Sequence, residues 1–230
     1  MKIEYLLLNL LILIGPLLMS FEKQIHFVDK WRYAWPAIVI VAVPYLIWDS
    51  LVTGAHWWFN EKYTLNFRLA SLPVEEWLFF ITVPFASIFV WEVIAFYYQR
   101  NRKLHLMRPV RYALYSLQLF GLIFFARGKE YTGLMLIFLG AAAIVDRVLK
   151  TNLFLQTRLF VYLAVLIGFI LIFNGYLTGR PVVLYGEAYQ LGIRIGTIPI
   201  EDFGYGLSLI LLATIFYEKF KTAAKQPPNI

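Results

Sequence analysis

The 230-residue sequence contains no cysteine. This absence excludes disulfide bonds, iron–sulfur clusters, thiolate metal sites and a cysteine nucleophile. The three histidines, His26, His56 and His105, are scattered along predicted loops, and this spacing predicts no metal site. The sequence also has no glycine-rich phosphate loop and no dinucleotide fingerprint, so we expect no bound nucleotide or other cofactor.

Charged residues are scarce, at 15% of the chain against 60% hydrophobic and 18% aromatic residues. A soluble domain of this length cannot cover its surface with so few charges, so the composition predicts an integral membrane protein in contact with lipids. The net charge of +7 comes from short segments between apolar runs and not from one basic face. We therefore expect no nucleic-acid partner.

Seven apolar runs, helped by their aromatic and basic flanks, are predicted to span the membrane as helices. They cover residues 5–21, 34–48, 74–98, 112–126, 131–145, 159–177 and 198–217. With seven crossings, seven of the 21 Lys and Arg residues lie on one side and fourteen on the other. The positive-inside rule then predicts a multi-pass protein of the cell (inner) membrane, with its N-terminus outside and its C-terminus in the cytoplasm.

An internal repeat organises the chain. A shift of 126 residues superposes "NEKYTLNFRLASLPVEEW", residues 60–77, on "GEAYQLGIRIGTIPIEDF", residues 186–203. Glu4-Tyr5 matches Glu130-Tyr131 at the same shift, and a shift of 125 aligns Asp49 with Asn174. Each repeat is therefore predicted to hold three helices, and residues 112–126 form an odd helix that lets both repeats insert in the same orientation.

The predicted fold is thus an all-α integral membrane protein of seven helices, arranged as two parallel three-helix repeats and one linking helix. We expect one membrane domain made of a first repeat (1–99), a basic loop and linking helix (100–126), a second repeat (127–220) and a cytoplasmic tail (221–230). The alternating stretches 63–71 and 189–197 predict a short β-hairpin on the extracytoplasmic side of each repeat.

Each repeat carries one copy of a motif, "PVEE" at residues 73–76 and "PIED" at residues 199–202. The prolines mark helix starts, so Glu75 and Glu201 lie in a first turn, where free N–H groups favour a negative charge. An apolar setting favours the neutral acid, and the combination suits a general acid. A lone acid of this kind is more often an interfacial anchor, but duplication inside membrane segments favours a function.

The adjacent Glu76 and Asp202 are rotated by about 100° around their helices. We expect them to face a different surface and to have the milder catalytic role. Asp49 and Asn174 are expected either to hydrogen-bond the motif acids or to end their helices. Rings near a proton donor can stabilise a carbocation, although an interfacial aromatic belt also explains many of them. The candidate substrate-binding residues are Trp48, Asp49, Asn174, Trp77, Phe80, Phe203 and Tyr205.

Through the doubled PxE(E/D) motif, the helical triplets and their tandem arrangement, the chain resembles the membrane-embedded lycopene cyclase family, in a fused form of its two-subunit type. The resemblance implies a cofactor-independent isomerase (an intramolecular lyase) that converts lycopene to γ-carotene and then to β-carotene. An acid protonates the terminal double bond of a ψ end, a neighbouring double bond captures the cation to close a ring, and proton loss leaves a β end. The acids implied are Glu75, Glu201, Glu76 and Asp202.

Other functions stay open at this point. A carotenoid hydratase or a C50 carotenoid cyclase is the nearest alternative, and a 3+1+3 membrane transporter is the main alternative from another class. A retinal-binding protein is disfavoured, because Lys219 and Lys221 lie only at the end of the last helix. The expected partners are lycopene, other linear carotenoids and lipids, with a homo-oligomer or contacts with other carotenoid enzymes also open. The ring isomer and the number of sites are undecided.

Overall fold

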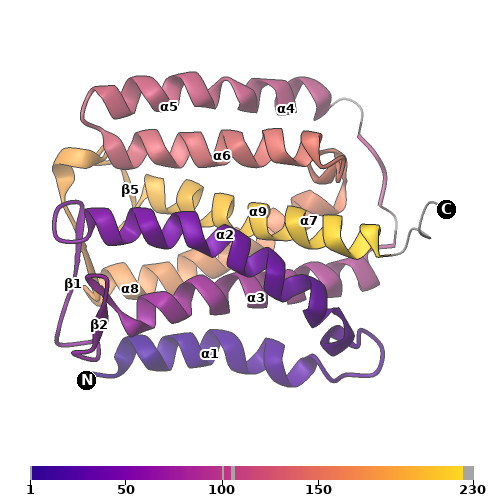
Figure 1. Cartoon of the computed structure of the whole chain (residues 1–230), viewed down its shortest axis with the longest axis horizontal. Coiled ribbons are helices and arrows are strands. Elements are labelled where there is room, and N and C mark those ends of the chain that lie inside the picture. The colour runs from indigo at the N-terminus through magenta and orange to yellow at the C-terminus, as the bar shows by residue number, and fades with distance from the viewer. Residues whose placement is uncertain (1, 100, 105–106, 225–230) are drawn as a thin grey trace.

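The computed structural model describes residues 2–99, 101–104 and 107–224. Over these residues the chain makes seven helical passes that run side by side (Figure 1). Six of the described passes are long and apolar enough to cross a membrane, and the other, α1, is an apolar helix of 16 residues. The prediction of a mostly helical protein is confirmed, and the six long apolar helices indicate a multi-pass membrane protein.

The passes follow the predicted apolar runs closely. They are α1 (Glu4–Met19), α2 (Trp31–Val52), α3 (Val74–Tyr97), α4 (Arg108–Tyr115) with α5 (Leu117–Ala126), α6 (Glu130–Val148), α7 (Arg158–Phe169) continued by the π-helical η4 (Ile170–Asn174) and α8 (Gly175–Gly179), and α9 (Ile200–Ala223). Short 3-10 turns lie at η1 (Phe27–Lys30), η3 (Leu153–Leu155) and η5 (Glu187–Tyr189).

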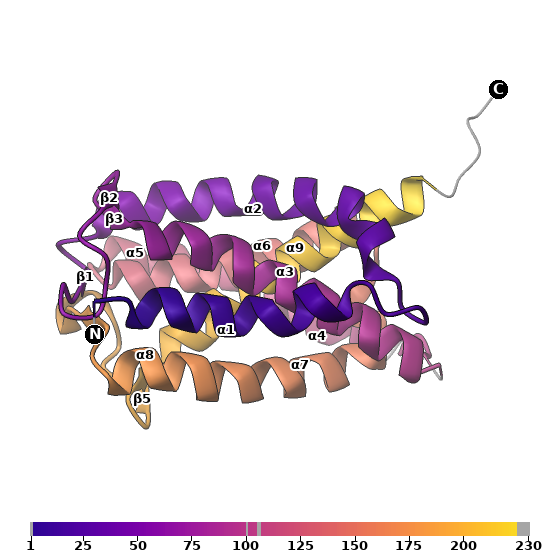
Figure 2. The same ribbon diagram turned by 90° about the horizontal axis from the view of Figure 1, so that it is seen from below.

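Helices α3 and α9 begin directly after Pro73 and Pro199, which are their N-cap residues. Proline suits this position, because its fixed φ prepares the chain for a helix start and its missing N–H is not needed there. Both helices start at the end of the molecule that carries the strands, and both run in the same direction (Figures 1 and 2). The two acidic motifs are therefore brought to one end of the helical bundle.

Among the residues that the structure describes, three small two-stranded sheets lie at this end. The strand β1 (Trp57–Phe59) pairs antiparallel with β4 (Val183–Tyr185), and so joins the connections of the two repeats. Two tight hairpins pair β2 (Arg68–Leu69) with β3 (Leu72–Pro73) and β5 (Arg194–Ile195) with β6 (Ile198–Pro199). The cross-repeat pairing of β1 and β4 was not predicted, because nothing local in either strand specifies its distant partner.

The predicted hairpins are present but much shorter than the alternating stretches suggested. Most of residues 63–71 and 189–197 is irregular, and Glu187–Tyr189 is a 3-10 turn. In each stretch one backbone N–H binds a carboxylate and not a strand: Glu75 accepts the backbone N–H of Leu65, and Glu201 accepts that of Leu191. Only the residues beside the tight turns keep ladder pairing.

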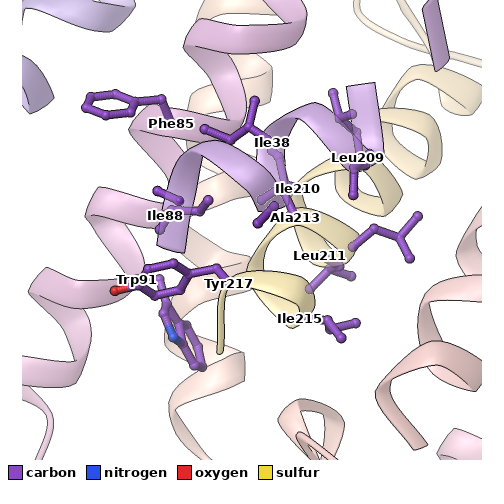
Figure 3. Close-up of a cluster of buried hydrophobic side chains, with 14 of the residues drawn as sticks. Ile38, Phe85, Ile88, Trp91, Leu209, Ile210, Leu211, Ala213, Ile215 and Tyr217 are labelled. Atoms are coloured by element: carbon purple, nitrogen blue, oxygen red, sulfur yellow. The ribbon is translucent and has the colours of Figure 1, made fainter. Parts of the chain in front are cut away.

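The core of the bundle lies between α3 and α9, with α2 packed against both. Figure 3 shows this cluster, in which Ile88 and Trp91 of α3 face Ile210 and Tyr217 of α9. Within the most apolar part of α9, 72% of the residues are buried. Close packing, and not water exclusion, holds helices together in a membrane. The two helices that carry the acidic motifs are thus the most firmly placed elements.

A network of ion pairs ties the helices together at the end opposite the motifs. Glu92 of α3, which is 5% exposed, contacts Lys221 of α9 and lies 2.6 Å from the ammonium group of Lys30. Lys221 also pairs with Glu218 at 2.9 Å, and Arg158 of α7 lies 4.0 Å from Glu218. A buried carboxylate requires such partners. The network therefore fixes the spacing of α3, α7 and α9.

Candidate active site

The four motif acids form two pairs that face in different directions. Glu76 and Asp202 line a cavity between the first turns of α3 and α9, where they are 8% and 5% exposed. Glu75 and Glu201 are fully buried and do not belong to the lining of this cavity. The rotation of about 100° between neighbouring helical residues separates the two pairs.

Glu75 and Glu201 bind the connections that precede their helices. Glu75 Oε1 accepts the backbone N–H of Leu65 at 2.6 Å, and Glu201 Oε1 accepts that of Leu191 at 2.8 Å. The hydroxyl of Thr132 also donates to Glu201 Oε1, at 2.6 Å. The same backbone contact recurs in both repeats. Glu75 and Glu201 therefore act as structural braces, by which we mean that each holds the connection before its helix against the first turn of that helix.

Glu76 and Asp202 each receive a hydrogen bond from a tyrosine. The hydroxyl of Tyr5 donates to Glu76 Oε2 at 2.5 Å, and that of Tyr131 donates to Asp202 Oδ1 at 2.5 Å. Tyr5 and Tyr131 occupy equivalent positions, so each repeat contributes one tyrosine–carboxyl pair from its first and third helices.

The surroundings of the two pairs differ. Asp202 Oδ2 accepts two further hydrogen bonds, from the Tyr185 hydroxyl at 2.7 Å and from Asn174 Nδ2 at 2.9 Å. Burial and the nearby Asp202 raise the pKa of Tyr185 well above its ordinary value, so that this hydroxyl stays a donor. At the position equivalent to Asn174, Asp49 lines the cavity and is close enough to Glu76 to interact electrostatically. The Tyr131–Asp202 pair is thus surrounded by hydrogen-bond donors, whereas the Tyr5–Glu76 pair has a second carboxyl, Asp49, beside it.

The cavity has a volume of about 80 Å³ and walls that are largely aromatic. The β1–β4 sheet covers it, since Trp57, Phe59, Val183 and Tyr185 all belong to its lining. Aromatic faces beside a proton donor can stabilise a cation. The remaining lining residues are Tyr5, Asp49, Glu76, Phe79, Phe80, Tyr131, Asn174, Leu177, Asp202, Tyr205, Gly206 and Leu209.

Reciprocal contacts between the repeats hold this end of the bundle closed. Glu4 of the first repeat accepts hydrogen bonds from Tyr176 at 3.0 Å and from Arg180 at 3.1 Å, both in the second repeat. The equivalent Glu130 of the second repeat lies 2.9 Å from Nε2 of His56 in the first repeat. Burial lowers the pKa of His56 even though the Glu130 carboxylate opposes this change. The first helix of each repeat is therefore joined to the other repeat next to the covering sheet.

An apolar groove of about 420 Å³ adjoins the cavity and shares part of its lining. It lies between α1 and α3 on one side and α7, η4 and α9 on the other. Leu11 and Met19, which line it, are 62% and 51% exposed, so the groove reaches the lipid-facing surface of α1. The residues common to the groove and the cavity are Phe79, Asn174, Asp202, Gly206 and Leu209. The groove therefore connects the hydrocarbon region with one carboxyl, Asp202.

The family model for lycopene cyclases matches residues 3–94 and 128–220. The chain belongs to the lycopene cyclase family. Each matched segment contains one motif and one tyrosine–carboxyl pair, which is consistent with a fused two-domain form. Searches of curated proteins and of solved structures gave no significant match. Membership makes this protein an enzyme of carotenoid biosynthesis and implies a carotenoid substrate.

The structure of this cyclase-family protein brings some of the predicted site residues together and separates others. Trp48 packs against His56, and Phe203 lies outside the lining of the cavity. Trp77 lies on the outer surface of α3, where its indole donates to the carbonyl of Leu69 at 3.1 Å. The predicted residues that do line the cavity are Glu76, Asp202, Asp49, Asn174, Phe80 and Tyr205.

Sequence reasoning did not select Tyr5 and Tyr131 as site residues. The signal was available, because Glu4-Tyr5 and Glu130-Tyr131 recur at the repeat spacing. This recurrence indicates only that the chain is repeated, since no local pattern shows that the first helix of each triplet packs against the acidic motif of the third helix. Among the described residues, no group of three or more His, Asp or Glu side chains is arranged to hold a metal ion.

Proposed function

We propose that the protein cyclises the ψ ends of lycopene to β rings, by way of γ-carotene to β-carotene, in a proton-initiated reaction without net redox change. The observation that supports this is the apolar groove that leads from the lipid-facing surface to Asp202, beside two tyrosine–carboxyl pairs. A hydrocarbon substrate dissolved in the membrane requires such a route. Membership of the lycopene cyclase family supplies the substrate class.

The volumes support a position of the reacting end of the substrate at the junction of groove and cavity. A cavity of about 150 Å³ is known to hold benzene. The cavity here, at about 80 Å³, is too small for a methylated six-membered ring, whereas the groove offers about 420 Å³. The substrate end therefore lies beside Asp202, Phe79 and Gly206, which line both spaces.

Asp202 is the acid that contacts the substrate in this proposal, because a proton donor must lie within hydrogen-bond reach of the atom that it protonates. Its proton moves to the terminal double bond, and the neighbouring double bond attacks the resulting cation to form the ring bond. A ring proton then returns to the Asp202 carboxylate. No atom is gained or lost, and the acid is regenerated.

The three donors around Asp202 strengthen it as an acid. Tyr131, Tyr185 and Asn174 hydrogen-bond its oxygens and stabilise the carboxylate that forms when the proton leaves. Glu76 and Asp49 lie in the same buried cavity, where several carboxylates cannot all be ionised at low cost. We assign them the role of retaining a proton in the cluster. Glu75 and Glu201 act as braces, the reverse of the ranking expected from the sequence alone.

The proposal includes the arrangement in the membrane. The two triplets, 1–99 and 127–220, form parallel repeats about the linking segment 100–126, with the tail 221–230 in the cytoplasm. The sheets and the acid cavity then face the extracytoplasmic side of the cell (inner) membrane. The support is the equal direction of α3 and α9 and the uneven division of Lys and Arg residues.

Expression in cells that accumulate lycopene, followed by chromatographic analysis of their pigments, tests the proposal. The expected product is β-carotene with γ-carotene as the intermediate. Rings of another isomer would refute the β assignment, and products that carry added water would indicate a hydratase. Unchanged lycopene, with the protein correctly inserted, would refute cyclisation.

A further inference from the structure

We infer that the protein has one working carotenoid groove, and that the two ends of lycopene are cyclised in it one after the other. This inference rests on the proposed function. It follows from a departure from the internal repeat: the molecule has two equivalent tyrosine–carboxyl pairs, but the space that leads to them is open on one side and filled on the other.

The repeat predicts where a second groove would lie. The open groove is bounded by α1, α3, α7 with η4, and α9. In the repeat, α1 corresponds to α6, α3 to α9, α7 to α2, and α9 to α3. The equivalent space is therefore bounded by α6, α9, α2 and α3, and it would lead to Glu76 in place of Asp202. Four residues that line the open groove, Ile12, Ile170, Phe79 and Gly206, have Phe138, Tyr45, Tyr205 and Phe80 as their counterparts.

These counterparts form an aromatic cluster that fills the equivalent space. The ring centroids of Tyr45 and Phe138 are 4.3 Å apart, and those of Tyr45 and Tyr205 are 4.9 Å apart. Phe80 lies 6.2 Å from Tyr45, measured in the same way. The Tyr45 hydroxyl is fixed by a hydrogen bond of 2.6 Å to Ser208 Oγ. Four rings therefore stand where the open groove has one ring, two isoleucines and a glycine.

The packing of the second helix of each repeat shows the same difference. In the most apolar part of Phe27–Val52, which contains α2, 39% of the residues are buried, against 17% for the equivalent Arg158–Gly179. The pass formed by α7, η4 and α8 lies at an edge of the bundle (Figure 2), and it contains the π-helical η4, a feature often found at functional sites. The second helix is thus more closely packed in the first repeat than in the second.

A single groove requires that the monocyclic product be released between the two ring closures. After the first ring closes, the monocyclic product must leave the groove and bind again with its unreacted end beside Asp202. Free monocyclic carotenoid is therefore an obligatory intermediate. Two working grooves would allow both ends to react without this release.

The experiment compares two glycine-to-phenylalanine variants in a strain that accumulates lycopene. Gly206→Phe places a ring in the open groove, as Phe80 does at the equivalent position. Gly168→Phe on α7 is the matched control, because a Cβ atom there meets nothing within 4 Å and the residue does not line the groove. We expect Gly206→Phe to lower the yield of both monocyclic and bicyclic products by at least about tenfold. A tenfold loss of substrate binding corresponds to the lower end of the usual free-energy cost of an overpacked side chain. Gly168→Phe should retain both products.

A chase experiment on the unaltered protein in liposomes tests the same point without a variant. Labelled lycopene is supplied first, and excess unlabelled lycopene is added during turnover. We expect label to accumulate in the monocyclic product. Label that passes to the bicyclic product unaffected by the chase would overturn the single-groove inference, as would a correctly inserted Gly206→Phe protein that still makes bicyclic product. Failure of the unaltered protein to cyclise lycopene at all would instead refute the proposed function.

Discussion

Asp202→Asn tests the assignment of the acid most directly. The substitution keeps the size of the side chain but removes the transferable proton. Positioned acid–base catalysis contributes about 10²–10⁴ to a rate, so we expect cyclisation to fall by at least roughly 10². Asn174 Nδ2 and the Tyr185 hydroxyl both donate to Asp202 Oδ2 at 2.9 and 2.7 Å. An asparagine that turns its NH₂ group toward them loses these bonds, at a cost of about 1–3 kcal/mol.

Glu75→Gln is the matched comparison. The carbonyl oxygen of a glutamine can still accept the backbone N–H of Leu65, now 2.6 Å from Glu75 Oε1. Because this contact survives, the connection should stay in place and the rate should fall by less than about tenfold, well below the loss expected for a positioned acid. The assay is conversion of lycopene in liposomes by equal amounts of inserted protein.

The outcome that refutes this reasoning is a reversal of the two effects. If Glu75→Gln lost roughly 10² in rate while inserted normally, and Asp202→Asn stayed near the unaltered rate, the carboxyl that contacts the groove would not be the proton donor. The ranking expected from the sequence, with Glu75 and Glu201 as the main acids, would then be correct. Glu76→Gln should fall between the two variants, because Glu76 lines the cavity but not the groove.

Three further predictions concern orientation, cofactors and stability. Single cysteines at Lys62 and Lys103 report topology cleanly because the chain has none of its own; we expect outside labelling at Lys62 and cytoplasmic labelling at Lys103, and the opposite pattern would reverse the orientation. Protein stripped of cofactors should still convert lycopene in liposomes, and an absolute requirement for added flavin would contradict a redox-neutral reaction. Glu92→Gln leaves two lysines without their buried carboxylate and should lower the unfolding free energy by about 3 kcal/mol in detergent. The control Glu61→Gln, at a side chain that is 78% exposed, should change it by less than about 1 kcal/mol; equal effects of the two variants would show that the Glu92 network does not stabilise the fold.

Much of the fold could be predicted from the sequence because its signals are local. A membrane helix needs a run of apolar residues, and all seven described passes coincide with such runs. The starts of α3 and α9 follow from Pro73 and Pro199, since proline acts on the backbone next to it. The repeat was visible because equivalent residues keep their spacing. The short β-hairpins were also predictable, but their exact extent was not, because period-two alternation does not show which backbone N–H groups a carboxylate will bind.

The site was predictable only as a set of residues. Phe80 and Tyr205 of the predicted set line the cavity together with Glu76 and Asp202, but helix phase alone cannot tell which of two adjacent acids faces a cavity. That depends on where the neighbouring helices lie: α1 brings Tyr5 to Glu76, and α6 brings Tyr131 to Asp202. Such contacts join residues 71 positions apart, and no local pattern contains them.

The sequence by itself determined the class of protein, the number of passes, the doubled motif and the family resemblance, because each depends on residue type and spacing along the chain. Only the tertiary structure decided which acids face the cavity and which side of the molecule is open. The two repeats share their sequence pattern but differ in side-chain volume at a few equivalent positions. Phe138, Tyr45 and Phe80 are the counterparts of Ile12, Ile170 and Gly206. Whether a larger side chain closes a groove depends on how the side chains of four helices pack against each other, because side chains from distant parts of the sequence fill the same space in a close-packed interior.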